Sequence, residues 1–381
     1  MKHIFVINPA AGKKDSSEDI MRAVAAIPGY DCEFYVTQGP RDATRYVKTW
    51  LEEHNGVQAR FYACGGDGTL NEVVNGVVGF DNASVGMYPS GSGDDFVKYY
   101  GGRDNFLDFK KLLDAPEDEI DLLTVDNGKP GEFRYSINIT NFGFDTTVAK
   151  TMIKVKRKKI IGGKRAYVTG VVTGLIKAMK NKCEITADGE RVDTKGRILL
   201  CTLANGGYVG GSFFCAPRAV NNDGLIEVTA FRPLSCITFV RLLGSYTNGT
   251  HLDDPRFQKY ITYRRAKEVK VKAPEGFSMS VDGEIVDGTE FTVGIAPKAI
   301  RFAVPEGCVL IAGRKGETVG GAPVEAEPAP AEPETPVEEA PVEEVAPVVE
   351  EAPAAEAQPE EAPEKAVEET PAEPAEEPAN A

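Results

Sequence analysis

Strand-like and helix-like patterns alternate over the first 90 residues, and this alternation restricts the possible folds more than any other feature of the sequence. Short apolar runs of the kind found in buried strands are followed by a turn and then by a helical pattern. Short links between alternating strands and helices favour a parallel sheet covered by helices. We therefore predict an N-terminal three-layer α/β domain. The predicted strands are residues 4–7, 33–37, 60–64 and 84–88, and the predicted helices are residues 17–27, 43–54 and 70–77.

The pattern changes after about residue 126, where short strand-like runs follow one another and turn sequences with Asn-Gly or Asp-Gly separate them. This arrangement favours an antiparallel structure, so we predict a C-terminal all-β sandwich domain. One basic, helix-like stretch, about residues 149–181, interrupts the series. The predicted strands are residues 133–139, 183–187, 198–204, 226–231, 268–273, 277–281, 291–295 and 300–304.

The acidity of the chain is concentrated at its C-terminal end. The formal net charge is −15, but 19 of the 58 acidic residues follow residue 321, against a single basic residue, Lys365. The Glu/Pro/Ala-rich segment 314–381 cannot bury enough apolar surface to offset chain entropy, and we predict that it is disordered. The predicted domains are then residues 1–125 and 126–295, and residues 296–312 are expected to return to the first domain.

Three glycine-rich turns follow predicted strands of the first domain. The most informative is Gly65-Gly66-Asp67-Gly68-Thr69, between a buried strand and a helix, where backbone N–H groups and the helix N-terminus suit a phosphate. Asp67 is unusual in such a cradle unless a cation such as Mg²⁺ lies between it and the phosphates. The other turns are Asn8–Gly12 and Pro89–Phe96. In a parallel sheet, loops at the carboxyl ends of the strands share one edge, where ligands bind.

Several functional classes are excluded by missing motifs. The sequence has no GxxxxGK[ST], no GxGxxG after its first strand, and neither HRD nor DFG, which argues against P-loop, dinucleotide-binding and protein-kinase enzymes. It has three histidines and no HExxH, and its seven cysteines include no CxxC pair. A histidine-based metalloenzyme or a disulfide framework is therefore not expected.

These loops belong to a longer motif series that resembles the diacylglycerol kinase catalytic-domain family, and in particular the soluble lipid kinases of bacteria. The resemblance covers about residues 1–312, although NAD kinases share the Gly-Gly-Asp-Gly-Thr element. The motifs are Asn8–Gly12, Gly65–Thr69, Pro89–Phe96, Ile120–Leu122, Asn141–Asp145, Asn205–Gly207, Pro217, Ala219, Asp223–Leu225 and Asp282–Glu284.

The resemblance implies roles for specific residues. ATP is expected in a cleft between the two domains, with Asp67, Asp95 and Asp121 in an acidic network around a catalytic Mg²⁺. Glu284 is expected to be the general base on the acceptor hydroxyl. A second, structural metal position corresponds to Asp223 and the carbonyls of Val220 and Leu225. The residues expected to face the nucleotide are Asn8, Pro9, Ala10, Ala11, Gly12, Thr37, Gly65, Gly66, Asp67, Gly68, Thr69, Leu70, Asn71 and Ser92. Asp94 stands where the family usually has Asn. The extra carboxylate either joins the metal network or faces solvent, and we expect the second.

The expected activity is ATP- and Mg²⁺-dependent phosphorylation of a lipid hydroxyl, with diacylglycerol to phosphatidic acid as the first choice. Sphingoid bases, ceramide and phosphatidylglycerol remain alternative acceptors. An NAD kinase and a nucleotide- or lipid-binding protein without catalysis remain alternative functions.

The chain is expected to be cytoplasmic and to contact the inner face of the membrane peripherally, because no apolar run reaches the roughly 18 residues of a membrane span. The basic stretch 154–165 is the proposed contact, since anionic headgroups attract Lys and Arg clusters. A solvated helix face or a dimer contact is the alternative interpretation. No nucleic-acid partner is expected, and a homodimer is suggested by the family.

Overall fold

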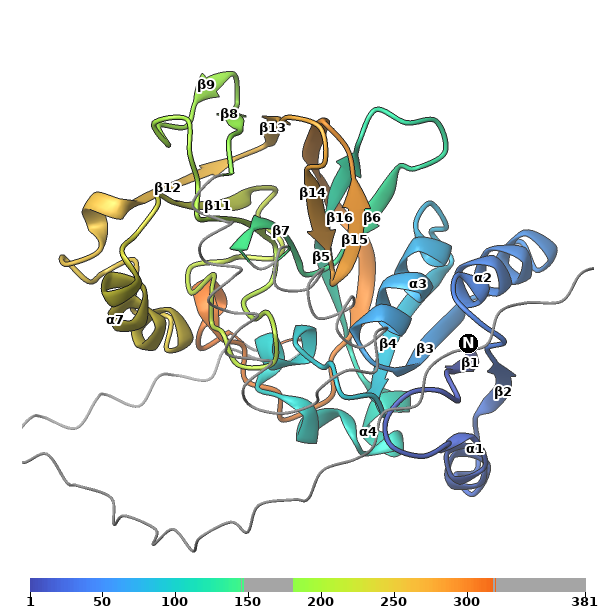
Figure 1. Ribbon diagram of the computed structural model, residues 1–381. Helices are drawn as coiled ribbons and strands as arrows, with labels where there is room; N and C mark the ends of the chain where they lie inside the picture. Colours follow the sequence, from blue (N-terminus) through green and yellow to red (C-terminus); the bar gives the residue numbers. More distant parts are fainter. Residues whose placement is uncertain (145, 147–180, 318, 320–381) are drawn as a thin grey trace, which may run out of the picture. The chain divides into compact units, whose positions relative to one another are not determined.

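The computed structural model describes residues 1–144, 146, 181–317 and 319 (Figure 1). The described residues belong to one compact unit, Met1–Glu327. The predicted helix-like stretch 149–181 lies outside the described residues except for its last residue, and so does almost all of the predicted tail.

The N-terminal part is the predicted α/β domain. Four parallel strands lie in the order β2-β1-β3-β4, and their central members are buried because their runs are almost entirely apolar. Helices α2 and α3 lie on one side of this sheet, and α1 and α4 lie on the other (Figure 1). The strands are β1 (Lys2–Ile7), β2 (Asp31–Val36), β3 (Ala59–Gly65) and β4 (Ala83–Pro89). The helices are α1 (Ser17–Ala25), α2 (Asp42–Glu53), α3 (Asp67–Val77) and α4 (Phe109–Asp114).

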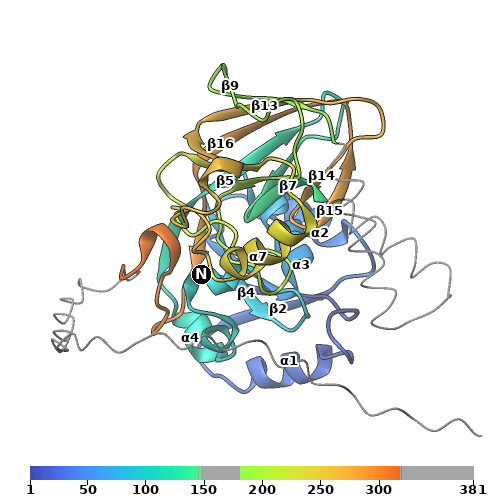
Figure 2. The same ribbon diagram turned by 60° about the vertical axis from the view of Figure 1, so that its left-hand side comes forward.

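The second part is the predicted β sandwich, seen in the upper half of Figure 2. One sheet is antiparallel in the order β12-β11-β10-β7-β14-β15. The facing sheet contains β5, β6, β8, β9, β13 and β16, and a separate apolar core fills the space between the two sheets. The first sheet consists of β7 (Ile139–Gly143), β10 (Leu200–Ala204), β11 (Ile226–Phe231), β12 (Ile261–Ala266), β14 (Ser278–Val281) and β15 (Glu284–Asp287). The facing strands are β5 (Glu117–Asp126), β6 (Arg134–Ser136), β8 (Glu184–Ala187), β9 (Glu190–Arg191), β13 (Glu268–Lys272) and β16 (Glu290–Ala303).

Two long strands connect the domains, which corrects one prediction. The sequence suggested separate strands at 291–295 and 300–304, but β16 is a single strand of 14 residues with a register shift between Ala296 and Ile300. Its first half pairs with β13 in the sandwich, and its Phe302 pairs with Val85 of β4 in the parallel sheet. Strand β5 runs beside β16 over its whole length. One ten-stranded sheet therefore extends through both domains.

Helix α7 (Cys236–Thr247) was not predicted from the sequence. Its exposed side carries Ile237 and Val240, which are 67% and 69% exposed, so it lacks the regular polar face by which amphipathic helices are recognised. The usable signal was Ser235, whose hydroxyl accepts a hydrogen bond from the backbone N–H of Thr238 at 3.1 Å. Ser is a favoured helix N-cap residue.

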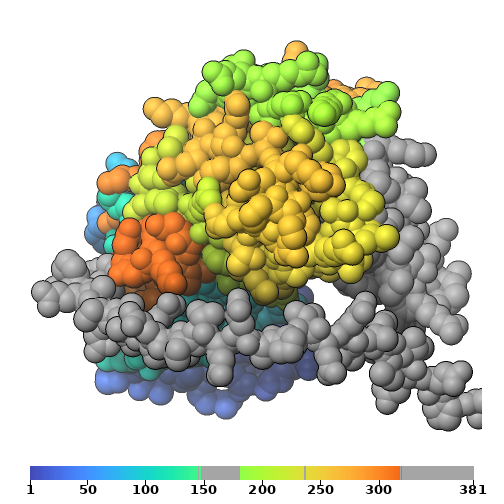
Figure 3. All heavy atoms as spheres, turned by 90° about the vertical axis from the view of Figure 1, so that its left-hand side faces the viewer, coloured from blue at the N-terminus to red at the C-terminus, as the bar shows by residue number. Residues whose placement is uncertain are grey.

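The folded chain continues beyond Gly313, where the sequence placed the start of the tail. Arg314 is 5% exposed, and its guanidinium donates to the Asp118 carboxylate at 2.6 Å and to the side-chain oxygen of Asn221 at 2.9 Å. Its Nε donates to Glu317 at 2.7 Å. Figure 3 shows this C-terminal segment, in red-orange, at the surface of the unit.

Candidate active site

A cavity of about 620 Å³ lies at the carboxyl ends of the parallel strands. Loops after β1, β2 and β4 and the start of α3 form most of its wall, and Glu284 of the sandwich completes it. The three glycine-rich loops therefore share one edge, as the sequence predicted. The lining residues are Asn8, Pro9, Ala10, Ala11, Gly12, Thr37, Gln38, Gly39, Pro40, Gly66, Asp67, Gly68, Thr69, Glu72, Gly91, Ser92, Gly93 and Glu284.

The loops contact one another so closely that some positions leave no room for a side chain. A Cβ on Gly66 would lie 2.8 Å from the carbonyl oxygen of Gly93, and a Cβ on Gly12 would lie 2.7 Å from that of Ser90. Gly12 also has a φ of +80°, a conformation that glycine adopts without strain. The side-chain amide of Asn8 donates to the Thr69 hydroxyl at 3.0 Å, which links the first loop to the second.

The N-terminus of α3 faces this cavity. Gly66 is the N-cap residue and offers no side chain to the free backbone N–H groups of the first turn. At Gly68 a Cβ would meet nothing within 4 Å, so the surface of the first turn stays open. An 11-residue helix with free N–H groups and a positive end attracts an anion such as a phosphate.

Asp67 braces the loop that follows β4. Its carboxylate accepts backbone hydrogen bonds from Asp95 at 2.9 Å and from Phe96 at 3.2 Å. Burial raises the pKa of this carboxyl to about 6, and the two backbone hydrogen bonds oppose the rise. The charges of Asp95 and Asp282 add to the increase in pKa.

This raised pKa predicts a pH-dependent stability. The ordinary pKa is 3.8, so between about pH 4 and pH 6 the folded state binds more protons than the unfolded state. Stability must then fall as the pH rises through this range, by about 3 kcal/mol for a shift of this size. Urea unfolding of the wild type and of Asp67→Asn, without nucleotide or metal, measures the difference. We expect the wild type to lose stability relative to the variant from pH 4 to pH 7; parallel curves would contradict the assignment.

Glu284 lies directly after the turn between β14 and β15, which brings it from the sandwich to the cavity. Its side chain is 53% exposed, and Nη1 of Arg134 donates to its Oε2 at 2.9 Å. Glu284 is thus accessible to an incoming hydroxyl and is held by one cation. Arg134, on β6, was not among the residues singled out from the sequence.

Two of the three carboxylates expected near the catalytic Mg²⁺ are not in the cavity wall. Asp95 accepts the Lys98 ammonium at 2.7 Å and the backbone N–H of Gly211 at 3.0 Å. Asp121 is fully buried, and backbone N–H groups of Gly224 and Lys298 donate to its two carboxylate oxygens, each at 2.7 Å. The structure brings only Asp67 of the three to the cavity.

Asp94 does not face solvent as expected. Its side chain is 17% exposed and lies 3.4 Å from the Lys98 ammonium and 3.7 Å from the Arg103 guanidinium. These cations compensate the extra charge at this position.

The carboxylate of the second metal position already has a cationic partner. Asp223 forms an ion pair with Arg265 and accepts the backbone N–H of Leu225 at 3.1 Å. Val220 lies in the same loop, beside Asn221, whose backbone carbonyl accepts the N–H of Asp121. Within the described residues no group of three His, Cys, Asp or Glu side chains could hold a metal ion.

Three residues expected to face the nucleotide lie outside the cavity wall. Gly65 is the last residue of β3, and Leu70 is fully buried in the core. The Asn71 amide is directed to Asp282 and to the backbone carbonyl of Tyr135, at 2.7 and 3.0 Å. The other predicted nucleotide residues all line the cavity.

Glu72 was missed, although it lies three residues after the glycine-rich motif Gly65–Thr69. One carboxylate oxygen accepts the backbone N–H of Arg41 at 2.8 Å, and the other accepts that of Ala43 at 3.2 Å. These bonds hold the start of α2, and with it the cavity loop Thr37–Pro40. The side chain of Glu72 binds the start of a different helix. Such a contact cannot be recognised from the residues next to Glu72 in the sequence.

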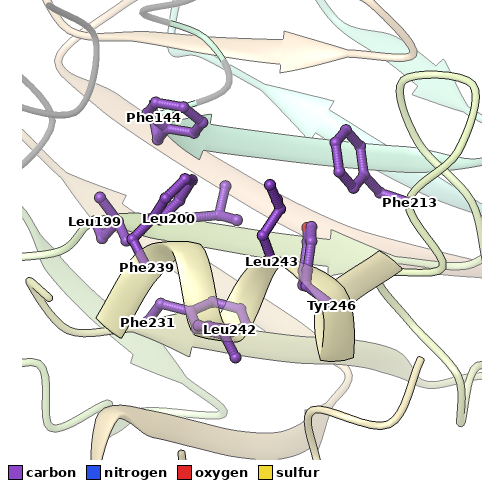
Figure 4. Close-up of a pocket in the computed structure, with 9 residues that line it drawn as sticks. All are labelled: Phe144, Leu199, Leu200, Phe213, Phe231, Phe239, Leu242, Leu243 and Tyr246. Atoms are coloured by element: carbon purple, nitrogen blue, oxygen red, sulfur yellow. The ribbon is translucent and has the colours of Figure 1, made fainter. Parts of the chain in front are cut away.

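A second, apolar cavity of about 60 Å³ lies between α7 and the sheet of β10 and β11 (Figure 4). Aromatic rings and leucine side chains from these elements and from Phe144 point into it. Its lining residues are Phe144, Leu199, Leu200, Phe213, Phe231, Phe239, Leu242, Leu243 and Tyr246. Its volume is far below the roughly 300–1,000 Å³ of pockets that hold small molecules.

The described residues thus form a two-domain fold in which the glycine-rich loops of the parallel sheet share a cavity with a carboxylate from the β sandwich. Residues 2–125 match the diacylglycerol kinase catalytic domain, and residues 138–304 match the YegS C-terminal NAD kinase beta sandwich-like domain. The chain belongs to the diacylglycerol kinase-like lipid kinases.

Known lipid kinases are similar to this chain over most of their own length. A probable lipid kinase YegS-like protein of Alcanivorax borkumensis is 27% identical over 305 residues, which is 79% of this chain and 96% of the relative. A diacylglycerol kinase of Bacillus subtilis is 28% identical over 286 residues, 74% of this chain and 88% of the relative. A crystal structure of a putative diacylglycerol kinase from Bacillus anthracis shares the fold, with a TM-score of 0.61, 20% identity, and 81% and 98% of the two chains covered.

Proposed function

We propose that this chain is an ATP- and Mg²⁺-dependent lipid kinase that phosphorylates a lipid hydroxyl, with diacylglycerol as acceptor and phosphatidic acid as product. The observation that carries the proposal is the position of Glu284, which the sandwich places opposite the three glycine-rich loops of the parallel sheet. Phosphoryl transfer depends mainly on positioning and on neutralising charge. The loops and the N-terminus of α3 would position the phosphates, and a cation held by a carboxylate of the cavity would neutralise their charge.

One group of residues would bind the phosphate donor ATP, and another would act on the acceptor hydroxyl. The open first turn of α3 and the loops at Gly12 and Ser92 would hold the phosphates of ATP. Mg²⁺ usually keeps several waters and binds through one or two carboxylates together with substrate phosphates, so Asp67 alone is a sufficient protein ligand. When bound, Mg²⁺ would neutralise phosphate charge. Glu284 would accept the proton of the acceptor hydroxyl, with Arg134 orienting its carboxylate.

The choice of a lipid acceptor rests on a relative. The related Bacillus subtilis protein is named a diacylglycerol kinase. The cavity beneath α7, at about 60 Å³, does not bear on the acceptor, because pockets that hold small molecules measure roughly 300–1,000 Å³.

A panel assay tests the acceptor. The wild type is incubated in mixed micelles with ATP, Mg²⁺ and, separately, diacylglycerol, a sphingoid base, ceramide and phosphatidylglycerol, with NAD as a soluble acceptor. Phosphorylation of diacylglycerol is expected. Phosphorylation of another lipid would change the assigned acceptor but not the proposed mechanism. Phosphorylation of NAD alone would show that the protein is an NAD kinase and not a lipid kinase. ATP binding without any turnover would favour a binding protein.

We also propose that the enzyme is cytoplasmic and works at the inner face of the membrane. No helix in the described part of the chain is long and apolar enough to cross a bilayer. The basic stretch 154–165 lies outside the described residues, and its role in membrane contact stays a prediction. A homodimer also stays a prediction, and sedimentation velocity tests it.

Neutralising the basic stretch should weaken membrane binding. Each Lys near an anionic surface contributes about 1 kcal/mol, so replacing Lys156, Arg157, Lys158 and Lys159 with Gln should lower partitioning to anionic vesicles by at least tenfold. Vesicle co-sedimentation measures the partitioning, and turnover of a micellar substrate controls for folding. Equal partitioning of both proteins would exclude this stretch as the contact.

A further inference from the structure

A hydrogen bond between Asn71 and Asp282 joins the two halves of the active site. Asn71 lies on α3, one turn after Asp67, and its Nδ2 donates to Oδ2 of Asp282 at 2.7 Å. Asp282 lies in the turn between β14 and β15, two residues before Glu284. The pair therefore connects the helix of the phosphate cradle directly to the hairpin that carries the expected base.

Asp282 is held much more firmly than a turn residue requires. Besides Asn71, its carboxylate accepts the Ser136 hydroxyl at 2.8 Å and the backbone N–H groups of Ile137, Asn138 and Ile139 at 2.9, 3.1 and 2.9 Å. An Asp-Gly pair alone suffices for a two-residue hairpin turn with positive φ, as found here at +45° and +89°. The five donors thus fix the hairpin in space rather than form its turn.

Both N–H donors of the Asn71 amide are used within the protein. Its Nδ2 also donates to the carbonyl of Tyr135 at 3.0 Å, and its Oδ1 accepts from Asn75 at 3.2 Å. Asn71 is also absent from the cavity wall. The residues before and after Tyr135 bind the hairpin too: Arg134 pairs with Glu284, and Ser136 with Asp282. Strand β6 and Asn71 thus form one support for the base.

We infer that Asn71 and Asp282 are positioning residues, which set the distance and orientation of Glu284 relative to the phosphate cradle, and that Asn71 does not bind the nucleotide. The inference rests on the proposed function. Small displacements of reacting groups are costly, since a shift of about 1 Å can lower a rate about a hundredfold. Loss of the pair should therefore lower kcat and leave the affinity for ATP unchanged.

The test separates kcat from ATP binding. Asn71→Ala is compared with the wild type in the lipid assay, and the Kd of ATP is measured by calorimetry. We expect kcat to fall ten- to a hundredfold, with the KM and Kd of ATP within about twofold. Asn71→Ser serves as a second variant if the first does not fold. Asn82→Ala is the matched control: Asn82 follows α3, its Nδ2 donates to the backbone carbonyl of Val57 at 2.7 Å, and it is not among the residues of the cavity wall. It should keep kcat.

A double variant makes the test specific to Glu284. In a Glu284→Gln background the base is already absent, so adding Asn71→Ala should change the residual kcat less than threefold. A tenfold weaker Kd for ATP with unchanged kcat would overturn the inference and make Asn71 a nucleotide ligand. Equal kcat of Asn71→Ala and the wild type, or a full additional loss in the double variant, would also overturn it. A wild type that phosphorylates no acceptor would instead remove the proposed function itself.

Discussion

Replacement of Glu284 with Gln is expected to lower kcat for lipid phosphorylation by 10²- to 10⁴-fold, the usual contribution of a general base. Glutamine has the same size and can still accept a hydrogen bond from Arg134, so the hairpin should keep its position. It cannot take up the proton of the acceptor hydroxyl. The Kd of ATP should stay within about twofold, because the phosphate cradle belongs to the parallel sheet. Initial rates with saturating lipid and ATP, together with calorimetry of ATP, measure both quantities.

Glu290→Gln is the matched control for this substitution. Glu290 begins β16, its side chain is 70% exposed, and its partner is Lys272 in the sandwich, so it loses an ion pair of the same kind away from the cavity. Its kcat should equal that of the wild type. If Glu284→Gln retained more than a tenth of the wild-type kcat, Glu284 would not be the base.

The second large effect concerns the end of the folded chain. A protein that stops after Gly313 loses Arg314 and leaves the buried Asp118 carboxylate without its cation. Removing one partner of a buried ion pair costs about 3–5 kcal/mol, because the remaining charge stays buried and uncompensated. We expect this shortened protein to have a much lower midpoint of thermal unfolding. This expectation corrects the one from sequence, by which everything after Gly313 is disordered.

A protein that stops after Val319 is the control, because it keeps both Arg314 and its partner Glu317. Its unfolding midpoint and its kcat should match those of the full chain. A point variant, Arg314→Met, should reproduce the loss, since Met fills similar space without charge. Coinciding melting curves for the two shortened proteins would contradict the role of Arg314.

The sequence predicted those parts of the fold in which the local pattern and the tertiary structure agree. Strands such as β1 and β3 are nearly continuous apolar runs, and the loop from Gly65 to Thr69 has few conformations open to it. Strand β16 was divided in two because Pro297-Lys298 reads as a turn, whereas the structure uses it as an irregularity inside one strand. Helix α7 was missed because Ile237 and Val240 stand on its exposed side, where an amphipathic helix has polar residues.

The side chains at the site were harder to predict than the backbone that carries them. Asn71 meets a partner 211 residues away, and Asp95 meets one 116 residues away. Such contacts leave no periodic or local trace in a single sequence. Asp67 and Glu284, which the family resemblance singled out, line the cavity. Asp95 and Asp121, which lie in equally recognisable motifs, are bound to distant backbone N–H groups.

The shared sheet has a consequence for the modularity of this protein. A fragment ending near residue 125 would keep the whole phosphate cradle but lose β16, the neighbour of β4. Strand β4 would then become an open edge, which invites pairing with other chains and aggregation. A fragment that begins after residue 125 would lack nearly all of strand β5, with which β16 pairs. Although the chain matches two separate domain families, one sheet runs through both domains. We therefore expect that neither domain folds by itself when it is transferred to another protein.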